Sequence, residues 1–193
     1  RDVALELEYY MKKNGAEGLS FDTIAASGKN SSMPHAIPTD KKLENGDFLT
    51  MDFGCLYDGY CSDMTRTVAI GNASDSMRKV YDIVLKAQME SMKCIKAGAW
   101  CNEVDAVARR VIADAGYGNC FGHGLGHSVG LFIHENPRFS PKCKAVLKPG
   151  MVITVEPGIY LPGQFGVRIE DLVAVTENGF INLTESDKSL IVV

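Results

Sequence analysis

FLTMDFGCLYDGYCSDMTRTVAI, residues 48–70, is the stretch of this chain that decides its fold. Two strand-like runs in it flank Asp58-Gly59, a dipeptide that strongly favours a two-residue hairpin turn. Counting back from that turn makes Asp52 and Asp63 diagonal neighbours on one face of the hairpin. Diagonal neighbours have Cα atoms roughly 7–8 Å apart, which is close enough for two carboxylates to converge on a metal ion.

The same pattern occurs a second time, 104 residues further along the chain. Leu43-x-x-Gly46-x-x-x-Thr50-x-Asp52-x-Gly54 matches Leu147-x-x-Gly150-x-x-x-Thr154-x-Glu156-x-Gly158. An acid in register indicates an internal duplication. With residues 162–164 as a three-residue loop, Glu156 falls directly opposite Glu170. Two similar halves would then each bring a carboxylate hairpin to a shared centre, as a two-metal site requires.

A solvated surface position is the ordinary place for an aspartate or glutamate. Three of these four acids lie instead in runs typical of buried strands, such as residues 48–53 around Asp52 and residues 152–155 before Glu156. A buried carboxylate without a partner either becomes neutral or destabilises the fold. Divalent cations would remove that cost, so the pattern predicts a metal site.

All four histidines join this pattern: His35, His123, His127 and His134. Glycines 124, 126 and 130 surround His127 and allow close approach of backbone to a ligand. His123 and His127 share a face if this segment is a strand, whereas His134 lies on the other face unless a bulge intervenes. Carboxylates with imidazoles suit paired Mn²⁺, Co²⁺, Fe²⁺ or Zn²⁺ and not a structural zinc site. The residues thus predict metal-assisted hydrolysis, although their spacing does not name the bond.

The bulk properties are those of a globular protein of one domain or two fused halves: 193 residues, 46% hydrophobic and 23% charged. A net charge of −4 argues against nucleic acid as a partner, and no apolar run is long enough for a membrane span. The six cysteines form no Cys-x-x-Cys pair, so free thiols in the cytoplasm are expected. We expect helices over residues 2–14, 75–97 (with Ser74 as N-cap) and 102–115, and strands over residues 21–26, 48–57, 60–70, 152–160, 165–175 and 180–183.

These motifs resemble the metallopeptidases of the pita-bread fold, which include methionine aminopeptidase, aminopeptidase P and prolidase. Asp-Phe-Gly, Ser-Asp-Met-Thr-Arg, His-Gly-x-Gly-His…His-Glu, Glu-Pro-Gly-x-Tyr and Arg-Ile-Glu occur in that order between residues 17 and 184. Residues 57–67 and the spacing of His123, His127 and His134 are most similar to the bacterial Xaa-Pro peptidase branch. The resemblance implies an α+β fold of two pseudo-symmetric halves, with a curved antiparallel sheet covered by helices. It also implies one catalytic metallopeptidase domain over residues 1–193, with the N-terminal part of the family domain missing.

The resemblance further implies roles for individual residues. The metal ligands would be Asp52, Asp63, His127, Glu156 and Glu170, holding two divalent ions, with Mn²⁺ or Co²⁺ ahead of Zn²⁺ or Fe²⁺. Glu156 would also be the general base, and His134 would stabilise the oxyanion. His35 and His123 would complete the catalytic set and contact substrate, His123 near the proline. Arg168 would bind or orient that end of the site.

The implied activity is a cytoplasmic exopeptidase that hydrolyses the bond before proline, of aminopeptidase P or prolidase type. Its partner would be a peptide, without nucleic acid or membrane, and a homodimer is compatible with the resemblance. The alternative enzyme is a methionine aminopeptidase. Metal-free amidinohydrolase relatives lose the acidic ligands that are present here. A metal-free peptide- or protein-binding module is the non-enzyme alternative.

Overall fold

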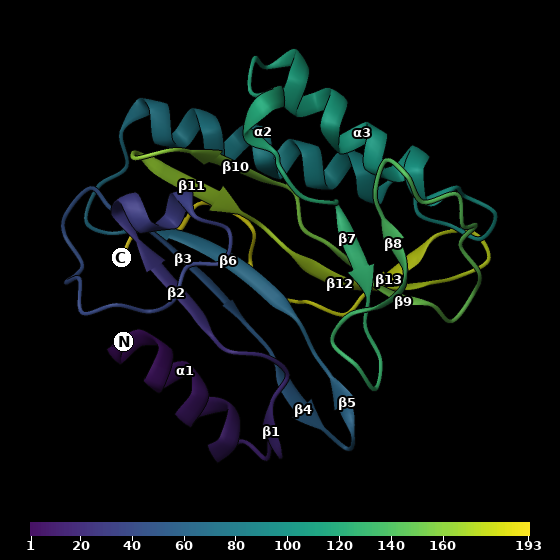
Figure 1. Cartoon of the computed structure of the whole chain (residues 1–193), viewed down its shortest axis with the longest axis horizontal. Coiled ribbons are helices and arrows are strands. Elements are labelled where there is room, and N and C mark those ends of the chain that lie inside the picture. The colour runs from purple at the N-terminus through teal and green to yellow at the C-terminus, as the bar shows by residue number, and fades with distance from the viewer.

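A computed structural model describes all residues, 1–193, as three α-helices and thirteen short strands (Figure 1). The helices are α1 (Asp2–Lys13), α2 (Asp75–Met92) and α3 (Cys101–Asp114), with 3-10 turns at η1 (Gly28–Ser32) and η2 (Gly118–Cys120). The first half contains strands β1 (Gly18–Leu19), β2 (Ile24–Ser27), β3 (Phe48–Phe53), β4 (Cys55–Tyr57), β5 (Tyr60–Cys61) and β6 (Met64–Ala69). The second half contains β7 (Gly126–Ser128), β8 (Glu135–Phe139), β9 (Val152–Val155), β10 (Gly158–Leu161), β11 (Phe165–Arg168), β12 (Asp171–Val175) and β13 (Phe180–Asn182).

The first hairpin has the predicted register. Tyr57 pairs with Tyr60 across the turn, and the count continues through β3 and β6 to pair Asp52 with Thr65. Each predicted long strand is split in two, because the ladder is interrupted at Gly54. A Cβ at Gly54 would lie 1.9 Å from the Ser62 carbonyl oxygen, so only glycine fits this crossing.

The second hairpin also keeps one register across an interruption. β10 pairs with β11 from Leu161–Phe165 to Gly158–Arg168, and β9 pairs with β12 so that Val155 faces Asp171. Both ladders follow the same count, which places Glu156 opposite Glu170 as predicted. The runs expected as two long strands are four short ones, and both glutamates lie in the gap.

The two halves meet at the acids. One sheet has the strand order β2-β3-β6 and the larger one the order β13-β12-β9-β7-β8. An isolated antiparallel bridge from Thr65 to Glu170 joins the two hairpins. Helices α2 and α3 lie side by side along one side of these strands, whereas α1 lies on the opposite side, next to β2 (Figure 1). The apolar core lies between the α2–α3 pair and the second-half strands, so it holds the base of the site rigid.

The helix boundaries show one wrong prediction. Ser74 caps α2 as expected, because its Oγ accepts a hydrogen bond from the Met77 amide at 3.3 Å. The helix was expected to reach residue 97 but ends at Met92. Residues 93–98 turn instead, because the amides of Ala97 and Gly98 bond to carbonyls of Thr176 and Leu147 in the second half. None of the helices has the length and apolar character required to cross a membrane.

Candidate metal centre

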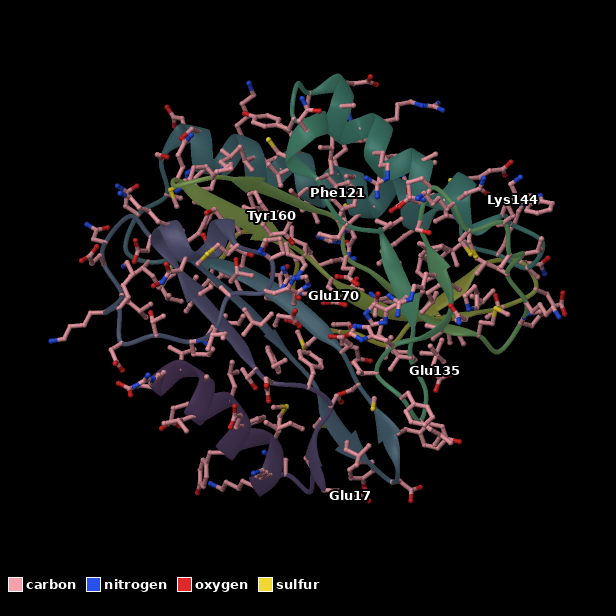
Figure 2. The ribbon with its side chains drawn as sticks, in the orientation of Figure 1. Glu17, Phe121, Glu135, Lys144, Tyr160 and Glu170 are labelled. Carbon is pink, nitrogen blue, oxygen red and sulfur yellow. The ribbon has the colours of Figure 1, made fainter.

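Three predicted ligands from separate parts of the chain converge. Asp63 precedes β6, His127 lies in β7, and Glu170 lies between β11 and β12. One ligand atom from each lies within 4.8 Å of the other two, and all three residues are buried. Figure 2 shows Glu170 near the middle of the molecule. Residues more than 100 positions apart are thus brought to one point by the paired hairpins.

Glu156 completes this cluster from the end of β9. Its Oε1 lies 3.3 Å from His127 Nε2, which in turn lies 3.5 Å from Asp63 Oδ2. Thr154 Oγ1 donates to Glu156 Oε1 at 3.0 Å and accepts the His127 amide at 3.0 Å. Thr154 was not predicted as part of the site, although the internal repeat matches it to Thr50. The threonine thus holds a glutamate and a histidine in fixed relation.

Asp52 and Glu170 each have one oxygen bound by protein and one oxygen without a partner. Asp52 Oδ2 accepts from Arg168 Nη2 at 2.6 Å, and Glu170 Oε2 accepts from Thr65 Oγ1 at 2.6 Å. The other oxygens, Asp52 Oδ1 and Glu170 Oε1, are buried and have no hydrogen-bond partner. Unpaired buried carboxylate oxygens are costly, and they are the donors that a divalent cation takes.

The pKa shifts within the cluster also favour a bound divalent cation. Burial, together with the charges of Asp52 and Glu156, raises the pKa of Asp63 to about 9. Burial also raises the pKa of Glu156 to about 7 and moves the pKa of Glu170 well above its usual range. Burial lowers the pKa of His127 to about 4, so its imidazole is neutral and able to ligate. Without a cation, carboxyls of this cluster must retain protons at neutral pH.

The residues therefore fit a divalent metal site of mixed oxygen and nitrogen donors. Asp52, Asp63, His127, Glu156 and Glu170 are the side chains that would hold the metal. Their donor chemistry excludes a structural thiolate site, since all six cysteines are free and none belongs to the cluster.

A hydrogen-bonded chain runs from Asp52 away from the cluster. Arg168 Nη1 donates to Tyr160 Oη at 2.8 Å, and Tyr160 Oη lies 2.9 Å from His123 Nε2. His123 Nδ1 lies 2.8 Å from the Gly124 carbonyl oxygen, so Nδ1 carries the proton and Nε2 accepts from Tyr160. Tyr160 ends the Glu-Pro-Gly-x-Tyr motif, and the motif alone predicts no role for it.

The remaining histidines line the cavity in front of the cluster. The β7–β8 pairing shifts register between His127 and Ser128, with the extra residues on β8. The rings of His127 and His134 lie 4.4 Å apart, so the two histidines share one site. His35 reaches the cavity from the loop before β3 and, like His134, is exposed. The predicted shared face of His123 and His127 is not a strand face, since His123 precedes β7. The site nevertheless collects all four histidines.

The cavity measures about 810 Å³ and opens to solvent. Arg138 of β8 lies on its wall, paired across the sheet with His127. Its guanidinium makes no ion pair in the structure, unlike that of Arg168. Arg138 was not predicted as a site residue; its position eleven residues after His127 gave no signal without the bulged β7–β8 pairing.

The model of metallopeptidase family M24 matches residues 1–177. The chain belongs to metallopeptidase family M24. It is 50% identical over 191 residues to a Xaa-Pro dipeptidase of Pyrococcus furiosus, covering 99% of this chain and 55% of the relative.

Solved structures of M24 peptidases agree with the fold. A Xaa-Pro dipeptidase from Bacillus anthracis superposes with a TM-score of 0.98 and 50% identity, covering 100% of this chain and 54% of that one. An X-Pro aminopeptidase from Thermotoga maritima gives a TM-score of 0.97 and 48% identity, covering 100% and 55%. The predicted α+β pita-bread fold is thereby confirmed. The M24 chain described here spans about half the length of the curated relatives it matches.

Proposed function

We propose that this chain is the catalytic domain of a metal-dependent exopeptidase that hydrolyses the peptide bond before proline in Xaa-Pro substrates. The observation that carries this proposal is the convergence of Asp63, His127 and Glu170, with unpaired oxygens on Asp52 and Glu170, at one side of an open cavity. The M24 relationship, with several relatives named as Xaa-Pro dipeptidases, supports the substrate class.

When bound, a pair of divalent cations supplies Lewis-acid activation of water and of the scissile carbonyl. Mn²⁺ or Co²⁺ is the expected metal, because oxygen donors dominate the set. Asp63, His127 and Glu170, whose ligand atoms lie together, would hold these ions with Asp52 and Glu156.

Glu156 is the proposed proton carrier. Thr154 fixes one orientation of its carboxylate by the 3.0 Å hydrogen bond to Oε1. In the metal-free protein burial raises the pKa of Glu156 to about 7, so its carboxyl can hold a proton there near neutral pH. Glu156 would accept a proton from the attacking water and deliver it to the proline nitrogen as that nitrogen leaves.

Three histidines that line the cavity would act on the substrate. His134 lies beside His127 at the exposed wall, where an N–H donor can stabilise charge on the carbonyl oxygen. His123, held by Tyr160, would face the proline ring, and His35 would close the cavity above the substrate. A bond before proline has no N–H, so recognition must rely on such groups around the substrate.

Arg138 supports a preference for dipeptides. It is a cation on the cavity wall without a carboxylate partner in the protein. A dipeptide ending in proline carries a free carboxylate close to the scissile bond, and a guanidinium pairs with carboxylates in two parallel hydrogen bonds. Arg138 would receive that carboxylate, whereas a longer substrate would replace it by an amide.

The test is hydrolysis by protein reconstituted with Mn²⁺ or Co²⁺. Xaa-Pro dipeptides, Xaa-Pro-Yaa tripeptides and Met-Gly-Yaa peptides are compared in one rate panel. We expect the Xaa-Pro dipeptides to be cleaved fastest, full inhibition by chelator, and recovery on metal addition. Full activity in excess chelator, or cleavage of Met-Gly-Yaa alone, would contradict the proposal.

Glu156→Gln gives the sharper test of mechanism. Loss of a general base costs about 10²–10⁴-fold in rate, so kcat should fall by at least about 10²-fold with folding intact. Glu177→Gln, at an exposed turn, is the matched control and should retain full activity. The relatives named as Xaa-Pro dipeptidases do not favour a methionine aminopeptidase. A metal-free binding module would not need four acidic metal ligands.

The cytoplasm is the proposed compartment. All six cysteines are free, including the half-buried Cys55 and Cys61, which is the state that a reducing compartment maintains.

A further inference from the structure

An ion pair on α3 between a buried aspartate and a half-buried arginine lies outside the acidic cluster. Asp105 and Arg109 are four residues apart and therefore lie on one face of the helix. Arg109 Nε donates to Asp105 Oδ2 at 2.6 Å, and Nη2 donates to Oδ1 at 3.1 Å. Asp105 is fully buried. A two-pronged contact of this kind is geometrically specific as well as strong.

The guanidinium of Arg109 also binds the loop that carries His123. Its Nη1 donates to the Phe121 carbonyl at 3.2 Å, and its Nη2 donates to the His123 carbonyl. The same guanidinium stacks over the Phe121 ring, 4.5 Å from the ring centre. The Phe121 ring packs edge-on against the His123 ring at a centroid distance of 5.1 Å, so this contact adjoins the site.

The carboxylate of Asp105 reaches the other end of that loop. Its Oδ1 accepts a hydrogen bond from the Leu125 amide at 3.0 Å. The carbonyl of Leu125 in turn accepts the Glu156 amide at 2.8 Å. A single residue therefore connects Asp105 with the backbone of the proposed base.

Apolar packing holds the two ends of the loop, since Phe121 and Leu125 are buried in the core, but His123 lies between them. Residues 121–125 contain two glycines, and only a short 3-10 turn precedes them. His123 must nevertheless present Nε2 to Tyr160, which is linked through Arg168 to Asp52. Its ring can keep that position only if its backbone is fixed, and Arg109 is the side chain that fixes it.

We infer that Asp105 and Arg109 are positioning residues, which hold the 121–125 loop so that His123 and Glu156 keep their places at the metal centre. Neither residue touches the cavity, so they act through the loop. The kinetic consequence rests on the proposed Xaa-Pro peptidase activity, whereas the effect on the loop does not.

Arg109→Lys is the test variant, because lysine keeps the charge beside Asp105 but lacks the fork that binds two carbonyls. Ile112→Ala is the control: Ile112 lies on the same helix, is fully buried in the apolar core and, having an apolar side chain, forms no hydrogen bond with the loop. Removing that side chain costs about 2–5 kcal/mol of stability. The control therefore reports what destabilising α3 does by itself.

The first readout is independent of activity. The protein has only four histidines, so long-range ¹H–¹⁵N spectra of the imidazoles resolve His123 in the metal-free and the Zn²⁺-loaded protein. Arg109→Lys should shift or broaden the His123 signals and leave those of His35 in place. Ile112→Ala should leave both unchanged. Unaltered His123 signals in Arg109→Lys would overturn the inference.

The second readout is steady-state kinetics with an Xaa-Pro dipeptide, in which kcat and KM are measured separately. Small misplacements at a site cost up to about 10²-fold, so Arg109→Lys should lower kcat/KM by at least about tenfold, and Ile112→Ala by less than about twofold. Equal losses in the two variants at matched stability would also overturn the inference. If Arg109→Lys does not fold, Asp105→Asn replaces it, since asparagine keeps one oxygen acceptor for the Leu125 amide and replaces the oxygen that accepts from Arg109 Nε by an NH2 group that cannot accept. Absence of Xaa-Pro hydrolysis in the unaltered protein would refute the proposed function alone, and the imidazole spectra would still decide the role of the pair.

Discussion

The stability of the metal-free protein should fall as the pH rises from 5 to 7. The Asp63 carboxyl has an ordinary pKa of 3.8 and, through burial first and the charge of Asp52 second, a pKa of about 9 in the folded protein. A folded-state pKa raised in this way stabilises the fold fully below pH 3.8, and the contribution is lost progressively as the pH rises toward 9. Between pH 5 and 7 the folded chain therefore keeps a proton that the unfolded chain has released.

The size of this effect follows from proton linkage. One retained proton lowers the free energy of unfolding by about 1.4 kcal/mol per pH unit, or about 3 kcal/mol from pH 5 to pH 7. For a domain of this length about 3 kcal/mol corresponds to a fall in Tm of roughly 6–12 °C. Saturating Mn²⁺ binds the ionised carboxylates and should reverse the trend.

The assay is thermal unfolding followed by circular dichroism, on chelator-treated protein at pH 5, 6 and 7. Asp63→Asn is the matched control, because it removes this proton and leaves every other titrating group. The difference in Tm between the two proteins reports the contribution of Asp63 together with its effect on the neighbouring Glu170 carboxyl, and it should fall as the pH rises. An identical pH dependence for Asp63→Asn and the unaltered protein would show that folded Asp63 does not retain a proton between pH 5 and 7.

Three further predictions follow from the structure. Gly54→Ala should weaken Mn²⁺ binding measured by calorimetry. Its methyl group would clash with the Ser62 carbonyl and push apart the two strands that carry Asp52 and Asp63. Unchanged Mn²⁺ binding would contradict the need for glycine at this position. Arg66→Met should lower the free energy of unfolding in urea by about 1–3 kcal/mol, because it removes the 2.7 Å guanidinium partner of the buried Asp171 and leaves Lys188 and Asn182 on that carboxylate. No measurable loss would show that the pair is dispensable. Cys101, whose thiol pKa burial raises to about 12, should resist alkylation of the folded protein at pH 8 while exposed thiols react; labelling at the same rate, detected by peptide mass spectrometry, would contradict its burial.

The parts of the fold that the sequence predicted are those determined by nearby residues. Asp58-Gly59 determines the first hairpin because a two-residue turn allows only one pairing, and the structure follows that count to Thr65. The repeat carried the same argument to Glu156 and Glu170. Ser74 began its helix as expected, since an N-cap acts within three residues.

The parts that the sequence did not predict depend on contacts between distant segments. The α2 helix ends early because residues 97 and 98 bond to carbonyls about 50–80 positions away, and no helix propensity records such a contact. The bulge that brings His134 to His127 is equally invisible in the spacing. Only the pairing of β7 with β8 reveals it.

The candidate site shows the same division. The five proposed ligands stood out as acids and a histidine in apolar or glycine-rich surroundings. Tyr160, Arg138 and the pair Asp105–Arg109 did not stand out, because their importance lies in the partners they meet in space. Thr154 is the exception, since its match with Thr50 in the repeat was a signal available in the sequence.

The central claim is that acids from both halves of the chain bind divalent cations at one centre. The most direct test is anomalous scattering from crystals of Mn²⁺-reconstituted protein, with data collected at the manganese edge. We expect anomalous peaks enclosed by Asp63, His127 and Glu170, and we expect these peaks to be lost in crystals of Glu170→Gln. Absence of a peak between these side chains at saturating Mn²⁺, or peaks that persist unchanged in Glu170→Gln, would contradict it.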